Sequence, residues 1–106
     1  MTDCVAVFVT CASGREALKL KDILLKEKTA ACVNIIKGVL SFFRWKGRID
    51  SCREVMLVAK TRRCMFGKLA RLVRKNHSYE VPEIIALPVV DGSRDYLKWV
   101  RENVKK

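Results

Sequence analysis

The sequence is organised around one stretch, residues 30–61, which predicts a single extended β-hairpin. Its first arm, residues 31–45, is rich in the β-branched and aromatic residues that pleated strands prefer: Val33, Ile35, Ile36, Val39, Phe42, Phe43 and Trp45. Lys46 and Gly47 form the predicted turn, because glycine takes positive φ values readily. The second arm covers residues 48–61.

The first arm is too long for a small compact domain. At about 3.3 Å per residue it spans roughly 50 Å. A compact chain of this length has a radius of gyration of only about 13 Å. The arm must therefore bend or project, and Lys37-Gly38 is the predicted position of a bend or bulge.

Both faces of the first arm are apolar. Because successive side chains alternate, one side carries Ala31, Val33, Ile35, Val39, Phe43 and Trp45, and the other carries Cys32, Ile36, Leu40 and Phe42. A sheet with helices on one face only should alternate apolar and polar residues. We therefore expect another subunit to cover the second face; the alternative is a central strand buried wholly within one domain.

The rest of the chain completes an α+β pattern. Strands are expected at residues 4–9 and 83–90, and helices at residues 14–28, 64–76 and 93–104. Ser13 with Glu16 fits a capping box, Ser93 caps the last helix, and Pro88 favours an edge strand or a bulge. The order βαββαβ predicts a ferredoxin-like plait, a four-stranded antiparallel sheet with two helices on one face, plus a C-terminal helix. Residues 1–106 form one domain by length.

Composition limits the classes of function. The chain has no run of 18 apolar residues and no positively charged signal-like start, which predicts a cytosolic protein without a membrane span. Its five cysteines are odd in number and lack C-x-x-C spacing, which argues against a disulfide framework or a zinc ribbon. The formal charge of +11 suits an anionic partner, but the cations are spread along the whole chain, so we interpret them as a solvated surface.

Several motifs follow one another along nearly the whole chain. They are KTAACVNI at residues 28–35, FRWKGRI at 43–49, KT at 60–61, HSYEVPEI at 77–84, LPV at 87–89, and then Gly92, Tyr96 and Trp99. In these motifs the sequence resembles the CutA divalent-ion tolerance family. The resemblance implies a ferredoxin-like plait that assembles as a tight homotrimer, with an architecture similar to the trimeric PII signalling proteins. It also implies a role in tolerance to divalent cations, copper above all.

The candidate metal ligands are His77 and Cys11. Copper(I) prefers thiolate ligands and copper(II) accepts imidazole. In family members proposed to hold copper, a cysteine near the end of the first strand joins a histidine pair after the second helix. Those positions fall on Val9 and on Asn76-His77 here, so Cys11, two residues past Val9, is the nearest thiol. The alternatives for His77 are to cap helix carbonyls or to bridge subunits.

A second candidate site is a polar cleft between subunits. Its residues belong to the family pattern and lie at strand ends and in loops: Trp45, Lys60, Tyr79, Glu83 and Trp99. A Lys–Glu pair with aromatic walls would suit a small anionic ligand. The alternative is a hydrogen-bonded network that fixes the geometry of the trimer.

Enzymatic and nucleic-acid functions find little support in the sequence. It has no G-x-S-x-G, H-E-x-x-H or P-loop motif, which favours a non-enzymatic protein. It also lacks an RNP1-like motif, so nucleic-acid binding is not expected, although a basic patch is conceivable from Lys60, Arg62, Arg63, Lys68, Arg71, Arg74 and Lys75. The leading hypothesis is a homotrimeric copper-tolerance protein that binds metal or signals in response to it. The alternative is a PII-like regulator that binds a small ligand and has no metal role.

Overall fold

The computed structural model describes residues 2–105; Met1 and Lys106, the ends of the predicted domain, lie outside the described residues. The elements are β1 (Cys4–Cys11), α1 (Gly14–Lys26), β2 (Cys32–Trp45), β3 (Arg48–Arg62), the 3₁₀ turn η1 (Arg63–Met65), α2 (Phe66–Asn76), β4 (Ile84–Pro88) and α3 (Arg94–Glu102). All strand pairs are antiparallel, in the order β2-β3-β1-β4. The predicted plait with an added C-terminal helix is confirmed.

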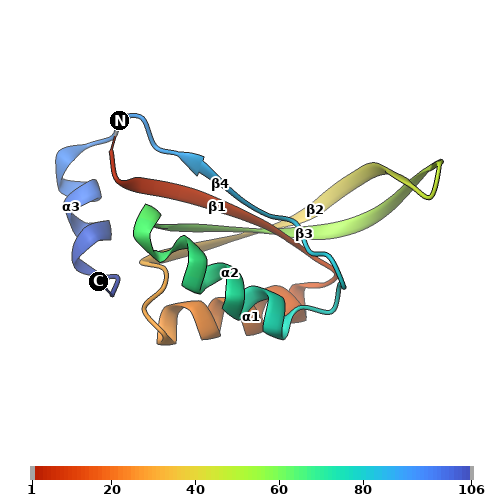
Figure 1. Cartoon of the computed structure of the whole chain (residues 1–106), viewed down its shortest axis with the longest axis horizontal. Helices are drawn as coiled ribbons and strands as arrows, with labels where there is room; N and C mark the ends of the chain where they lie inside the picture. The colour runs from red at the N-terminus through yellow and green to blue at the C-terminus, as the bar shows by residue number, and fades with distance from the viewer. Residues whose placement is uncertain (1, 106) are drawn as a thin grey trace.

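The core lies between the sheet and the two helices α1 and α2, which cover the same face (Figure 1). Alternate residues of β1 and β3 point to the helices and are fully buried there, including Val7, Val9 and Leu57. Burying a side chain of this kind contributes about 1.5–3 kcal/mol. The helix α3 lies apart, at the end of the sheet, where Leu97 and Val100 pack on Cys4. The core therefore fixes α1 and α2 relative to the end of β1.

The hairpin of β2 and β3 extends well beyond the helices (Figure 1), and the molecule measures 44 × 26 × 23 Å. Both turn residues take positive φ, Lys46 at 51° and Gly47 at 77°, as a type I′ turn requires. The predicted bulge is confirmed: the register shifts between Ile36 and Val39, and Gly38 has a φ of 77°. The strand therefore both bends and projects.

The predicted division of the first arm into two faces is wrong beyond this bulge. Directly opposed residues of an antiparallel pair share a face. Before the bulge, Ile36 pairs with Met56. After it, Val39 pairs with Glu54 and Leu40 with Arg53, so the pairing is shifted by one residue. The one extra residue thus moves Val39, Phe43 and Trp45 to the face of Ile36, and it moves Leu40 and Phe42 to the face of Val33.

Neither face of the projecting hairpin is covered within one chain. Phe42 and Ile49 are each 72% exposed, and Trp45 is 58% exposed. Behind them, Ile36, Ile85 and Leu87 lie exposed on the sheet face opposite α1 and α2. A single chain therefore leaves the apolar second face of the first arm uncovered, as expected.

Several predicted boundaries need correction. The strand β1 extends beyond the predicted residues 4–9 to Cys11, because Cys11 continues the ladder by pairing with Val55. The helix α1 ends at Lys26 rather than residue 28: Lys28 takes a φ of 56°, and the N–H groups of Lys28 and Thr29 donate to the carbonyls of Leu25 and Leu24.

The remaining elements differ from the predicted ranges by a few residues. The predicted second helix begins as the η1 turn and becomes α-helical at Phe66. The strand β4 is shorter than predicted but holds the predicted edge position, and α3 ends at Glu102. Within residues 2–105 no helix combines the length and hydropathy needed to cross a membrane.

Candidate metal centre

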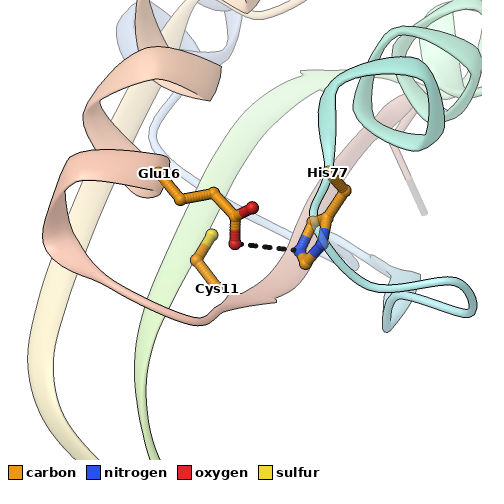
Figure 2. Close-up of side chains that lie close together, drawn as sticks. All are labelled: Cys11, Glu16 and His77. Carbon is orange, nitrogen blue, oxygen red and sulfur yellow. Dashed lines mark ion pairs between the residues drawn. The ribbon is translucent and has the colours of Figure 1, made fainter.

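Three elements meet at the end of β1 and bring three donor side chains together (Figure 2). Cys11 is the last residue of β1, Glu16 lies in the first turn of α1, and His77 follows α2. The Cys11 sulfur, a Glu16 carboxylate oxygen and a His77 ring nitrogen all lie within 4.8 Å of one another. The side chains of Cys11 and His77 are fully buried and that of Glu16 is 11% exposed. The fold thus places the two candidate ligands side by side and adds a carboxylate.

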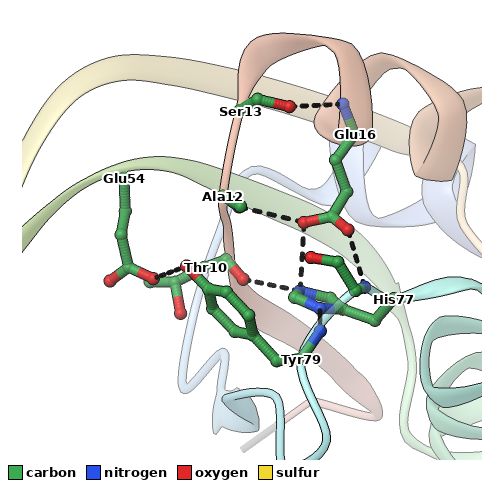
Figure 3. Close-up of polar contacts among 8 residues, drawn as sticks. Thr10, Ala12, Ser13, Glu16, Glu54, His77 and Tyr79 are labelled. Carbon is green, nitrogen blue, oxygen red and sulfur yellow. Dashed lines mark hydrogen bonds and ion pairs between the residues drawn. The ribbon is translucent and has the colours of Figure 1, made fainter.

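Glu16 ties the start of α1 to the loop after α2 (Figure 3). Its N–H donates to Ser13 Oγ at 3.1 Å, which confirms the predicted cap. Its carboxylate, instead of completing the capping box at Ser13, accepts from the N–H groups of Ala12 at 2.9 Å and Ser78 at 2.7 Å. Burial is the largest effect on its pKa and raises it, but these hydrogen bonds and His77 together hold the pKa of Glu16 below its usual value. The carboxylate is therefore charged at neutral pH.

The His77 ring is held by backbone groups on both nitrogens. The N–H of Tyr79 donates to Nδ1 at 3.0 Å, so Nδ1 accepts and carries no proton. The ring proton then lies on Nε2, which is 2.8 Å from the Thr10 carbonyl oxygen and 3.7 Å from Glu16 Oε1. In this tautomer His77 bonds to β1 through the Thr10 carbonyl rather than to the carbonyls of its own helix.

Cys11 is a protonated thiol in this environment. Burial, followed by the negative charges of Glu16 and Glu54, raises its pKa to about 12. A thiolate is the form that ligates metals, and a cation beside the sulfur favours it. The thiol therefore stays uncharged at neutral pH unless positive charge arrives next to it.

Tyr79 connects this cluster to the opposite sheet face. Its ring lies 4.8 Å from that of His77, and its hydroxyl donates to Glu54 at 2.8 Å (Figure 3). Glu54 is a buried carboxylate of β3, opposite Val39 on the face away from α1. Burial and then this hydrogen bond raise the pKa of Tyr79 above its usual range. The loop after α2 is thus anchored at His77, Ser78 and Tyr79.

The predicted polar cleft is not assembled within one subunit. Trp45 pairs with Arg48 at the tip of the hairpin, whereas Lys60 pairs with Cys32 at its far end and donates to Asn34. Tyr79 is engaged with Glu54, Trp99 contacts Tyr96 on α3 with ring centroids 5.7 Å apart, and Glu83 is exposed before β4. A site that contains all five residues needs more than one copy of the chain.

Sequence reasoning missed Glu16 and Glu54 as members of the site. The only signal for Glu16 was its spacing from Ser13, which predicts a cap and says nothing about Ser78, 62 residues away. Glu54 gave a weaker signal, a single carboxylate in an otherwise apolar part of β3. Both roles depend on contacts between distant segments.

Comparison with known proteins places nearly the whole chain in one family. The family model for the CutA1 divalent ion tolerance protein matches residues 5–103. The divalent-cation tolerance protein CutA of Thermus thermophilus is 43% identical over 97 residues, which cover 92% of this chain and 94% of that protein. A solved structure of a divalent cation tolerance protein from Thermus thermophilus has a TM-score of 0.94 and 41% identity, and the match covers 96% of this chain and 99% of that one.

Two further relatives correct the predicted cytosolic location. An Arabidopsis thaliana relative, described as Protein CutA, chloroplastic, is 40% identical over 101 residues, or 95% of this chain. A structure from Archaeoglobus fulgidus, described as a periplasmic divalent cation tolerance protein, has a TM-score of 0.93 and 36% identity and covers 96% of this chain and 99% of that one. Since this fold occurs in proteins assigned to other compartments, the lack of a signal-like start was no guide to location, and the prediction is not supported.

The relatives also differ in length. The match covers 56% of the Arabidopsis protein and 54% of a human Protein CutA that is 41% identical over 97 residues. This chain therefore spans about half the length of those relatives, whereas it matches the Thermus protein almost end to end.

Proposed function

This chain belongs to the CutA1 divalent ion tolerance family, and from that premise we propose that it binds copper or a similar cation through Cys11, Glu16 and His77. The description of the family names tolerance to divalent ions and names no reaction. We propose that residues 1–106 act as one non-enzymatic domain, which holds the ion or signals its presence.

The observation that carries this proposal is the convergence of sulfur, nitrogen and oxygen donors within 4.8 Å. Thiolate ligands suit Cu(I) and Zn²⁺, and imidazole suits copper and zinc in general. Ligands at 2.0–2.3 Å from a tetrahedral ion are about 3.6 Å apart. The most widely separated donors therefore have to approach one another by about 1 Å to share an ion, whereas His77 Nε2 and Glu16 Oε1 are already 3.7 Å apart.

Binding would change the hydrogen bonds that now hold His77. For Nε2 to ligate an ion, the ring gives up its contact with Thr10, and the proton has to move to Nδ1, where the Tyr79 N–H now donates. Residues 77–79 therefore have to shift. Binding also removes a proton from Cys11, so affinity should increase with pH.

An anaerobic Cu(I) titration against a chromogenic competitor such as bicinchoninate tests the site. We expect Cys11→Ser and His77→Gln each to weaken binding at least tenfold, because each removes a ligand. Cys64→Ser, which removes an exposed thiol outside the cluster, is the matched control and should bind like the parent protein. Equal affinity in the parent, Cys11→Ser and His77→Gln proteins would reject the site.

We also propose that the chain works as a homotrimer with PII-like architecture. The support is the exposed apolar surface of the projecting hairpin and of the sheet face opposite α1 and α2. Copies of the chain around a threefold axis would cover that surface for one another, because each presents the same projecting arm.

A second candidate function is the binding of a small anionic ligand between subunits, with no role for a metal ion. It is favoured by the separation of Trp45 and Lys60 at opposite ends of the hairpin, since only neighbouring subunits bring such ends together. A thermal-shift screen with nucleotides tests it: a ligand of the native state raises the melting temperature. The rise should disappear in Lys60→Gln; a rise that persists there places the ligand elsewhere.

A further inference from the structure

The outer face of α2 carries a concentration of positive charge. Residues Phe66–Asn76 include four basic residues and no acidic one. Leu69, Ala70 and Val73 are buried against the core, and the basic residues share the opposite side of the helix: Lys68, Arg71, Arg74 and Lys75. None of the four has an ion-pair partner among the described residues.

This arrangement is electrostatically unfavourable for the chain by itself. Lys68 lies three residues from Arg71, which lies three and four residues from Arg74 and Lys75, the spacings at which like charges on a helix repel. Polyanion binding would relieve that repulsion. The face also stays free in the proposed trimer, since α2 lies on the helical side of the sheet and the apolar surface lies on the other.

We propose that this α2 face binds the phosphate backbone of double-stranded nucleic acid, independently of any metal role. Lys68 and Lys75 are seven residues apart, so the four cations line about 10 Å of helix. A duplex offers one charge per about 1.7 Å of its axis, and cations on such a strip contact several phosphates at once. The sequence-based expectation against nucleic acid rested on the missing RNP1-like motif and on cations spread along the chain. A basic patch that included these four residues was conceivable there, and the structure gathers the four on one side of one helix.

The residues on this face of α2 favour a nucleic-acid duplex over other polyanions. Single strands are typically bound on aromatic platforms, and the exposed residues of α2 include no aromatic side chain. Helices that bind membrane surfaces insert large apolar side chains, and the exposed side of α2 has none of these either. Long cations alone suit a rigid array of phosphates and predict binding without sequence preference.

Fluorescence anisotropy with a short labelled DNA duplex tests the proposal across a salt series. With four phosphate contacts, log K should fall against log salt with a slope of about −3.6, or roughly a hundredfold between 50 and 200 mM. Arg71→Gln/Arg74→Gln should halve the slope, and Arg71→Lys/Arg74→Lys should restore it. The matched control Arg94→Gln/Lys98→Gln removes two exposed charges from α3 and should leave the slope unchanged.

Four results would overturn the proposal. The first is no binding of the duplex at the lowest salt, and the second is an equal loss of duplex affinity in the α2 and α3 double variants. The third is tighter binding of the corresponding single strand than of the duplex. The fourth is preferential binding to phosphatidylserine vesicles in a sedimentation assay. Circular dichroism of each variant separates a lost contact from a lost fold.

Discussion

At the scale of single residues, the candidate site joins a charged carboxylate to a protonated thiol and an imidazole. The Glu16 carboxylate is fixed by two backbone N–H groups, the Cys11 thiol is protonated, and the His77 ring accepts the Tyr79 N–H at Nδ1. A largely buried carboxylate beside sulfur and nitrogen donors is an arrangement that favours a cation. The same burial that suppresses the thiolate protects the sulfur from adventitious chemistry.

The shifted pKa of Cys11 predicts a specific dependence of stability on pH. Its folded pKa is raised to about 12 from 9.0, so the neutral thiol stabilises the fold fully below pH 9, and this contribution is lost as pH rises toward 12. The difference in unfolding free energy between the parent and Cys11→Ser should therefore shrink above pH 9, by at most about 1.4 kcal/mol per pH unit.

Urea denaturation at a series of alkaline pH values measures that difference. Cys64→Ser is the control, because Cys64 is exposed and its replacement should produce a difference that stays flat with pH. A flat difference for Cys11→Ser as well would show that the thiol ionises as readily in the folded state as in the unfolded chain.

At the scale of elements, the hairpin depends on backbone conformations that few residues adopt. Gly47 has a φ of 77° at the turn, whereas Gly67 lies near the start of α2 with nothing within 4 Å of an added Cβ. Gly47→Ala should lower the free energy of unfolding by about 1 kcal/mol through left-handed strain. Gly67→Ala should raise it by about 0.5–1 kcal/mol, because alanine favours a helix.

Urea unfolding of the two variants measures whether each substitution lowers or raises the free energy of unfolding. Each change adds a single methyl group, so the variants control for one another. Shifts of the same sign would mean that the turn tolerates a side chain at Gly47, or that Gly67 serves a contact that a bare Cβ does not reveal.

The same element shows how far sequence reasoning reaches. The turn at Lys46-Gly47 and the bulge at Gly38 were predictable, because both follow from local backbone preferences. The exchange of faces beyond the bulge was not, since the register of pairing with β3 decides it. The cluster shows the same limit: Cys11 and His77 were named individually, but Glu16 entered through a hydrogen bond to a residue 62 positions away.

At the scale of the whole molecule, an apolar arm projects from a small body. The longest dimension, 44 Å, is nearly twice the shortest, 23 Å. Exposed side chains such as Phe42 and Trp45 at the projecting end make the isolated subunit poorly suited to water. Tyr79 contacts His77 of the donor cluster and donates to Glu54, which lies on the sheet face that the trimer would cover. The Tyr79 side chain would therefore connect the cation site to the trimer interface.

Native mass spectrometry of the protein titrated with Cu(I) tests assembly and binding together. Three copies of the 12.1 kDa chain predict a species of about 36 kDa that takes up three copper ions. The Cys11→Ser protein should keep the trimeric mass and lose the copper. A well-folded monomer of 12.1 kDa at micromolar concentration, or a trimer whose copper content is unchanged by Cys11→Ser, would contradict the account.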